Sequence, residues 1–213
     1  MKPILFNTAM VQAILEGRKT TTRRLVKVNS SLDFIGCSST GGDFDTAAFG
    51  KGCYEKILDA KIIERVKAQY MPGDILYVRE TWFEGDILDS NEDIVERNIV
   101  LYRTDDLEKY DIEEIKWRPS IHMPKRLARI FLKVTGVRVE RLKRIEAGQC
   151  KAEGIDLGYK IENSFDAGEY CKAFGELWDS TVNKKDIDKY SWNANPYVWV
   201  IEFERIEKSE VEQ

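Results

Sequence analysis

The sequence predicts an α+β fold in which short strands form a β-barrel. Several short β-rich segments are joined by segments of helical periodicity, and their order shows no βαβ rhythm. A chain of 213 residues with 43% hydrophobic and 11% aromatic residues can bury a substantial core. By length alone it forms one large domain or two small ones.

The first elements follow from local patterns. Residues 3–6 are an apolar run typical of a strand. Asn7 or Thr8 can then cap a helix, whose apolar stripe ends before Gly17. Residues 20–28 are rich in β-forming side chains and predict the next strand.

The middle of the chain is less regular. Serine and glycine dominate residues 29–53, which favours a loop or a loosely paired hairpin. Residues 55–69 fit either a helix or a strand. After a turn at 71–74, residues 74–79 and 99–103 are expected to be strands. The acidic stretch between these two strands is expected to be a solvated loop or helix.

The second half has a clearer pattern. Strands are expected on both sides of Gly136, and a helix at residues 146–153 is expected to end at Gly154. Residues 166–182 form an amphipathic helix with an apolar stripe of Tyr170, Phe174, Leu177 and Trp178. Residues 197–206 close the chain as a strand.

The charge distribution restricts the class of partner. A net charge of −4 argues against a protein that coats nucleic acid through bulk charge. Basic residues nevertheless cluster within 18–27 and 125–144, whereas acidic residues concentrate within 84–114. A local basic surface on an acidic body suits a defined site for one nucleotide or a short strand.

Nothing in the sequence indicates a membrane or metal protein. No run approaches the roughly 20 apolar residues of a membrane span, and the first residues are too quickly polar for a signal peptide. We therefore expect a cytoplasmic protein without a membrane partner. Four cysteines without a C-x-x-C pair, and a single histidine, offer no clear zinc site. No cofactor is expected, and the thiols are expected to be reduced.

The strongest functional signal is the segment Glu-Gly-Arg-Lys-Thr-Thr-Thr-Arg-Arg at residues 16–24. It places four cationic side chains and three threonine hydroxyls directly after a predicted helix. Burying an unpaired charge is expensive, so a chain folding for stability alone would not choose this cluster. The segment suits an anionic ligand, a carbonyl group to be attacked, or both.

This segment resembles the ASCH domain, a small β-barrel related to the PUA family of RNA-binding modules. The resemblance rests on the pattern Gly17-x-Lys19-x-x-Thr22-x-Arg24 and on three later stretches, 72–82, 117–124 and 193–203. Together they are similar to the longer ASCH proteins of phage and prophage genomes. The resemblance implies a single PUA-like domain over residues 1–213, with peripheral helices and insertions at about 28–60 and 84–97.

The resemblance also implies site residues. ASCH amidohydrolases that deacetylate N4-acetylcytidine are described with a lysine, a threonine and a glutamate, which correspond here to Lys19, Thr22 and Glu153. A threonine hydroxyl is a weak nucleophile that needs a base within hydrogen-bond distance. A lysine can be that base where neighbouring cations lower its pKa, and a carboxylate can orient it or relay a proton. No metal is required.

The arginines around the motif are candidate ligand-binding residues. Arg18, Arg23 and Arg24 could crowd Lys19 and lower its pKa, or bind an anionic ligand directly. In the non-catalytic alternative, Lys19 and the threonine only bind a phosphate or a base. The later glutamate then caps a helix or pairs with an arginine.

Further candidates follow predicted strands. Arg79, Glu80 and Trp82 could line the mouth of the barrel. Glu80 is a second candidate for a catalytic carboxylate, or a partner of Arg79 within the fold. Trp82 could stack on a base or belong to the core.

Two other groups have a structural interpretation that we favour. His122 lies between two apolar residues, so we expect a buried, hydrogen-bonded histidine rather than an acid or base. Asn193 and Asn195 could read a base edge, but the proline after them favours turn formation.

Three functions remain open at this point. The leading expectation is binding of RNA or a nucleoside-like ligand in a cleft around the motif. The alternative is metal-free deacylation of N4-acetylcytidine or related N-acylated cytidines. The third is an accessory phage protein that recognises a host partner. A nucleoside hydrolase needs a closed pocket of one-base size, whereas an RNA binder needs an open groove with basic strands beside it.

Overall fold

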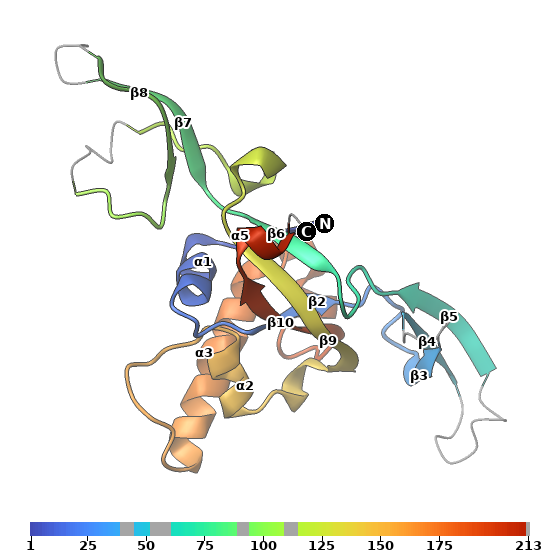
Figure 1. The fold of residues 1–213 in the computed structure, drawn as a ribbon. Helices are drawn as coiled ribbons and strands as arrows, with labels where there is room; N and C mark the ends of the chain where they lie inside the picture. Colours follow the sequence, from blue (N-terminus) through green and yellow to red (C-terminus); the bar gives the residue numbers. More distant parts are fainter. Residues whose placement is uncertain (39–44, 52–60, 89–93, 109–114, 212–213) are drawn as a thin grey trace. The chain divides into compact units, whose positions relative to one another are not determined.

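Figure 1 shows the structure, a computed structural model, as a ribbon coloured along the sequence. The chain groups into two compact units. The structure describes residues 1–38, 45–51, 61–88, 94–108 and 115–211. The first unit combines residues 1–17, 75–133 and 205–213, and the second combines 18–74 and 134–204. The chain contains both helices and strands, and the strands form several sheets. The predicted α+β class is therefore confirmed. The single domain expected from the sequence stays a prediction, because a packing unit does not by itself define a domain.

The first unit contains a small sheet and a hairpin. Its elements are β1 (Lys2–Leu5), α1 (Thr8–Leu15), β6 (Ile75–Arg79), β7 (Trp82–Leu88), β8 (Ile94–Tyr102), η2 (Ser120–His122), η3 (Lys125–Leu127), the start of β9 (Phe131–Arg141), the end of β10 (Tyr197–Ile206) and α5 (Lys208–Val211). Strand β1 pairs in parallel with β6, and β6 pairs antiparallel with β9. Strands β7 and β8 pair antiparallel with each other.

Helix α1 begins and ends where the sequence predicts. The Asn7 side chain accepts a hydrogen bond from the Met10 amide at 2.9 Å, which satisfies one of the free donors at the helix start. Val11 and Ile14 are buried on one face. Gly17 then adopts a φ of +74°, the left-handed conformation that a helix end requires.

The second unit contains the candidate site. Its elements are β2 (Thr21–Leu25), β3 (Asp33–Ser38), β4 (Thr46–Lys51), β5 (Lys61–Lys67), the rest of β9, η4 (Leu142–Arg144), α2 (Ala147–Ala152), α3 (Ser164–Thr181), η5 (Lys184–Asp186), α4 (Ile187–Tyr190) and most of β10. Strand β10 lies between β9 and β2 in the sheet order and pairs antiparallel with β2. Strands β3, β4 and β5 form a separate antiparallel sheet.

The core of the second unit packs helices α2 and α3 against β10. Tyr170, Phe174 and Trp178, from the predicted stripe of α3, are buried together with Val198 and Val200 of β10. Because successive residues of a strand point to opposite faces, the residues between these valines face away from the helices. This alternation gives β10 one face toward the core and one face toward the pocket described below.

The predicted barrel is wrong: among the described strands, no sheet closes on itself. A barrel requires matched tilt and stagger in every strand, which local sequence pattern does not reveal. The structure instead places β3, β4 and β5, from the first expected insertion and the residues after it, in a sheet of their own.

Three local expectations also need correction or refinement. The acidic stretch expected to be a loop or helix forms the β7–β8 hairpin within its described residues. Residues 61–67, for which helix and strand were both open, form strand β5. The two strands expected around Gly136 are one continuous strand, β9. Residues 52–60 and 89–93 lie outside the described part of the chain.

A glycine in β4 offers a test of the small sheet. A β-carbon at Gly50 would lie 2.0 Å from the Lys61 carbonyl oxygen and 2.7 Å from Ile35 Cδ1. We predict that Gly50→Ala lowers the free energy of unfolding by about 1–3 kcal/mol, because the backbone of β5 must move. Urea unfolding measures this change. The matched control is Gly36→Ala in β3, where no atom lies within 4 Å of the added carbon, and equal effects of both variants would contradict the prediction.

Candidate functional site

The functional segment begins the second unit and lies against the end of helix α2. Gly154 follows this helix with a φ of +98°. Its amide donates to the Lys151 carbonyl, and the Ile155 amide donates to the Cys150 carbonyl. This paired pattern is a Schellman motif, and it satisfies two of the free carbonyls at the helix end.

The next three carbonyls are satisfied by three consecutive residues of the segment. The Thr20 amide donates to Ala152 O at 2.9 Å, Lys19 Nζ donates to Glu153 O at 2.7 Å, and Arg18 Nη1 donates to Gly154 O at 3.0 Å. Cations are also favoured at a helix C-terminus because the carbonyl dipoles point toward them. The basic motif therefore caps α2.

One carboxylate binds two buried cations. Glu153 Oε2 accepts from Lys19 Nζ at 2.9 Å, and Glu153 Oε1 accepts from Arg23 Nη1 at 2.9 Å. The three residues are only 2–3% exposed. Unpaired charges at this depth would cost several kcal/mol, so the three groups depend on one another.

Alternating charges lead from this cluster toward the surface. Arg23 Nη2 also donates to Glu140 at 3.3 Å and to Gln149 at 3.1 Å. Arg138 pairs with Glu140 at 3.3 Å and with Glu202. Arg138 and Glu202 have side chains that are 40% and 44% exposed, so the chain of ion pairs ends at solvent.

Thr22 and Arg24 lie on the other face of β2 from Arg23. They stand opposite Ile201 and Trp199 of β10 in the strand register. Thr22 is 1% exposed, and its Oγ1 accepts from Arg24 Nη1 at 2.9 Å. Arg24 Nη1 also donates to the Arg23 carbonyl, so Arg24 links Thr22 to the backbone of Arg23.

The electrostatics of Lys19 are dominated by its burial. Burial lowers the pKa of Lys19, Glu153 opposes this effect, and Arg24 and Arg23 lower the pKa further. The ammonium group nevertheless donates to three oxygens, those of the Thr21 carbonyl, the Glu153 carbonyl and the Glu153 carboxylate. These bonds use the three donor hydrogens of a protonated lysine.

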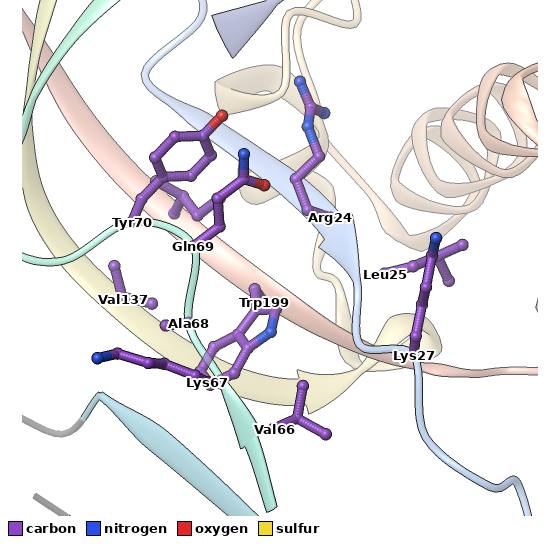
Figure 2. Close-up of a pocket in the computed structure, with 11 residues that line it drawn as sticks. Arg24, Leu25, Lys27, Val66, Lys67, Ala68, Gln69, Tyr70, Val137 and Trp199 are labelled. Carbon is purple, nitrogen blue, oxygen red and sulfur yellow. The ribbon is translucent and has the colours of Figure 1, made fainter. Parts of the chain in front are cut away.

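A pocket of about 240 Å³ lies on the Arg24 side of the strands (Figure 2). Its wall is formed by strand β2 and the residues after it, by the end of β5 and the residues after it, and by strands β9 and β10. The lining residues are Arg24, Leu25, Lys27, Val66, Lys67, Ala68, Gln69, Tyr70, Val137, Trp199 and Ile201. The wall thus combines aromatic rings, an amide and three cations with aliphatic side chains.

The position of Tyr70 is fixed by the turn that follows it. The Met71 amide donates to Asp74 Oδ2 at 2.8 Å, and the Val134 amide donates to Asp74 O at 2.9 Å. Burial raises the pKa of the Tyr70 phenol and nearby Arg24 opposes the rise, so the hydroxyl is protonated at neutral pH. Figure 2 shows the Tyr70, Gln69 and Arg24 side chains extending in the same general direction.

The structure brings together most of the residues singled out around the motif. Glu153 is in direct contact with both Lys19 and Arg23. Arg18 donates to the carbonyl of Gly154, the residue after Glu153. Lys19 and Thr22, around which the sequence predicts a ligand-binding cleft, are both buried. Of these motif residues, Arg24 lies in the pocket wall, and the described lining does not include Lys19, Thr22 or Glu153.

Arg79, Glu80 and Trp82 lie in the first unit. Both oxygens of Glu80 accept from Arg129, at 3.0 and 2.9 Å. The arginine partner of Glu80 is therefore Arg129 and not Arg79, which the sequence had offered as an alternative. Arg79 Nη1 donates to the Ile121 carbonyl at 3.1 Å. Trp82 is 3% exposed and belongs to a hydrophobic cluster, as the core alternative predicted.

Two structural expectations have different outcomes. His122 is exposed, so the buried histidine expected from its apolar neighbours is wrong. Asn195 adopts a φ of +49° before the proline, as a turn residue does. Its side chain accepts from the Lys143 amide at 2.8 Å, which connects the start of β10 to η4.

Sequence reasoning missed Tyr70, Gln69 and Trp199 of the pocket wall. Gln69 ends the stretch 55–69, for which helix and strand were both open, and Tyr70 lies between that stretch and the predicted turn at 71–74. Trp199 lies in a correctly predicted strand, and its place opposite Arg24 follows only from the β2–β10 register. The described residues contain no group of three or more His, Cys, Asp or Glu side chains that could hold a metal. No described helix is long and apolar enough to cross a bilayer.

Comparisons with known proteins give a distant structural neighbour. No protein-family model matches the chain, and no curated protein matches it. The crystal structure of protein EF3133 from Enterococcus faecalis V583, described as family-model DUF984, is similar over 100% of this chain and 82% of that chain. The identity is 9% and the TM-score is 0.39, a remote likeness that leaves the family and the function open.

The lowered pKa of Lys19 predicts how stability depends on pH. An unfolded lysine titrates near 10.5. Between the lowered pKa and this value the unfolded chain binds more protons, so the contribution of Lys19 to the free energy of unfolding rises with pH. We predict that the difference in this free energy, parent minus Lys19→Met, becomes more positive as the pH rises from the lowered pKa toward 10.5. Urea unfolding at several pH values measures the difference. Lys172→Met, at an exposed lysine of α3, is the control. A difference that falls as the pH rises would contradict the prediction.

Proposed function

We propose that the second unit binds a nucleoside-like ligand, free or within RNA, in the pocket beside Arg24. The observation that supports this most is the composition of the wall, in which Tyr70 and Trp199 accompany Arg24 and Gln69. Ligand pockets commonly measure about 300–1,000 Å³. A pocket of about 240 Å³ is therefore suited to a small ligand, on the scale of one nucleoside.

Each group in the wall has a role in such binding. An aromatic ring offers a stacking surface to any base, and a Gln side chain can donate to and accept from a base edge. Arg24, Lys27 and Lys67 give the wall three positive charges, which suit a phosphate or a base carbonyl. The resemblance of the motif to ASCH proteins supports the same class of ligand.

The buried cluster has a positioning role in this proposal. Lys19 and Arg23 hold β2 to the end of α2 through Glu153. Arg24 is the neighbour of Arg23 in β2 and its guanidinium also donates to the Arg23 carbonyl at 3.1 Å. The cluster therefore fixes the strand that presents Arg24 to the pocket.

Metal-free amide hydrolysis is the second candidate. It is favoured by one observation, a buried lysine with a lowered pKa beside a carboxylate, which is typical of functional sites. In the described geometry the three hydrogens of Lys19 Nζ are donated to oxygens, so the amine would first have to release one of them to act as a base. Binding without turnover needs no such change.

Titration of matched variants tests the binding site. We predict that the parent binds cytidine and that Gln69→Ala weakens binding roughly five-fold or more, since a lost neutral hydrogen bond costs about 1 kcal/mol. Gln69 is exposed, so the fold should tolerate this change. Isothermal titration calorimetry with cytidine and with a short cytidine-containing RNA measures both affinities.

Salt dependence and turnover separate the ligand classes. For RNA, three wall cations predict a slope of log affinity against log salt near −2, because each neutralised phosphate of a single strand contributes about −0.7. Lys67→Ala should reduce this slope, whereas Lys61→Ala, at another exposed lysine of β5, should not. Loss of N4-acetylcytidine absorbance with the parent would instead establish hydrolysis. Binding of neither ligand, or equal effects of both lysine variants, would overturn the proposal.

A further inference from the structure

Two cysteines of the second unit lie in contact on the helix side of the strands. The sulfur atoms of Cys150 in α2 and Cys171 in α3 are 3.8 Å apart, and both thiols are free. A disulfide bond is about 2.05 Å long, so the sulfurs would approach by roughly 1.8 Å. Side-chain rotation with a small helix shift can cover this distance.

The two thiols differ in access. Cys150 is 0% exposed within the core formed by α2, α3 and β10. Cys171 is only partly buried. An oxidant from solvent therefore meets Cys171 first, and Cys150 is the only described thiol in contact with it.

We propose that Cys150 and Cys171 form a redox-responsive pair that a hydroperoxide converts into an intramolecular disulfide. Cys171 is the thiol that reacts with the oxidant, and Cys150 is the resolving thiol. This modification site is independent of the ligand proposed for the pocket.

The chemistry balances with the hydroperoxide as oxidant. The Cys171 sulfur, as thiolate, attacks one oxygen of the hydroperoxide, so that an S–O bond forms and the O–O bond breaks. The other oxygen takes up a proton and leaves as water from hydrogen peroxide, or as an alcohol from an organic hydroperoxide. The Cys150 sulfur then attacks the Cys171 sulfur of the sulfenic acid. An S–S bond forms, the S–O bond breaks, and the oxygen leaves as water with the Cys150 proton. Burial raises the pKa of Cys150, so its proton has to pass to the departing oxygen as its sulfur attacks.

The bond would act on the helix that supports the site. Cys150 precedes Glu153 by three residues in the α2 segment, whose last carbonyls bind Arg18, Lys19 and Thr20. A bond to α3 would attach this helix end to the longest helix of the unit. We expect oxidation to raise the unfolding temperature, because a cross-link limits the unfolded chain.

The test uses a protein in which the pair provides the only thiols. The Cys37→Ser, Cys53→Ser variant is treated with hydrogen peroxide while folded, and free thiols, intact mass and linked peptides are measured. We expect both thiols to be lost together, the mass to fall by two hydrogen atoms, the Cys150 and Cys171 peptides to be joined, and dithiothreitol to reverse these changes. The melting temperature of the oxidised form should rise.

Other products would overturn the proposal. These are oxygen addition without a disulfide, a disulfide between two chains, or two thiols that stay free at peroxide concentrations that oxidise a reference dithiol. Adding Cys171→Ser to the same background should abolish the loss of the Cys150 thiol. Should that variant not fold, the products of the two-cysteine protein decide the question alone.

Discussion

The second unit depends on the Glu153 carboxylate, which pairs with two buried cations at once. One oxygen accepts from Lys19 and the other from Arg23, and these side chains are almost completely buried. Each cation alone would be expensive to bury, and Lys19 meets the Glu153 carbonyl, and Arg23 the Gln149 side chain, because β2 lies against the end of α2. The shared carboxylate therefore holds β2, which also pairs with β10, against the end of α2.

The same contacts explain the cationic segment that dominates the sequence. Its backbone and side chains satisfy successive carbonyls at the end of α2, and its charges suit a helix C-terminus. A cluster that looks unfavourable in sequence is thus paired in the fold. Its buried residues Lys19 and Arg23 hold the strand in place through Glu153. Arg24, on the opposite face, contributes to a pocket with aromatic and amide groups. We infer that support and recognition are divided between the two faces of β2.

Local elements could be predicted from sequence because their signals are local. The cap at Asn7, the stripe of α3 and the last strand all follow from spacing within a few residues. Long-range pairing could not be predicted in this way. Lys19 and Glu153 are 134 residues apart, and only the resemblance to ASCH proteins placed them in one site. Trp199 and Arg24 meet through strand register, and Arg129, the partner of Glu80, carried no distinguishing pattern.

A double-mutant cycle on Lys19 and Glu153 tests the central claim most directly. The free energy of unfolding is measured by urea for the parent, Lys19→Met, Glu153→Gln and the double variant, with Glu176→Gln at an exposed site of α3 as control. We expect about 3–5 kcal/mol of destabilisation for Glu153→Gln, because it leaves buried Lys19 without a carboxylate partner and Arg23 with Glu140 as its carboxylate. The double variant should be more stable than the sum of the single effects implies, by about 1–3 kcal/mol. Effects that add within about 0.5 kcal/mol would show that the two residues act independently and would contradict the account.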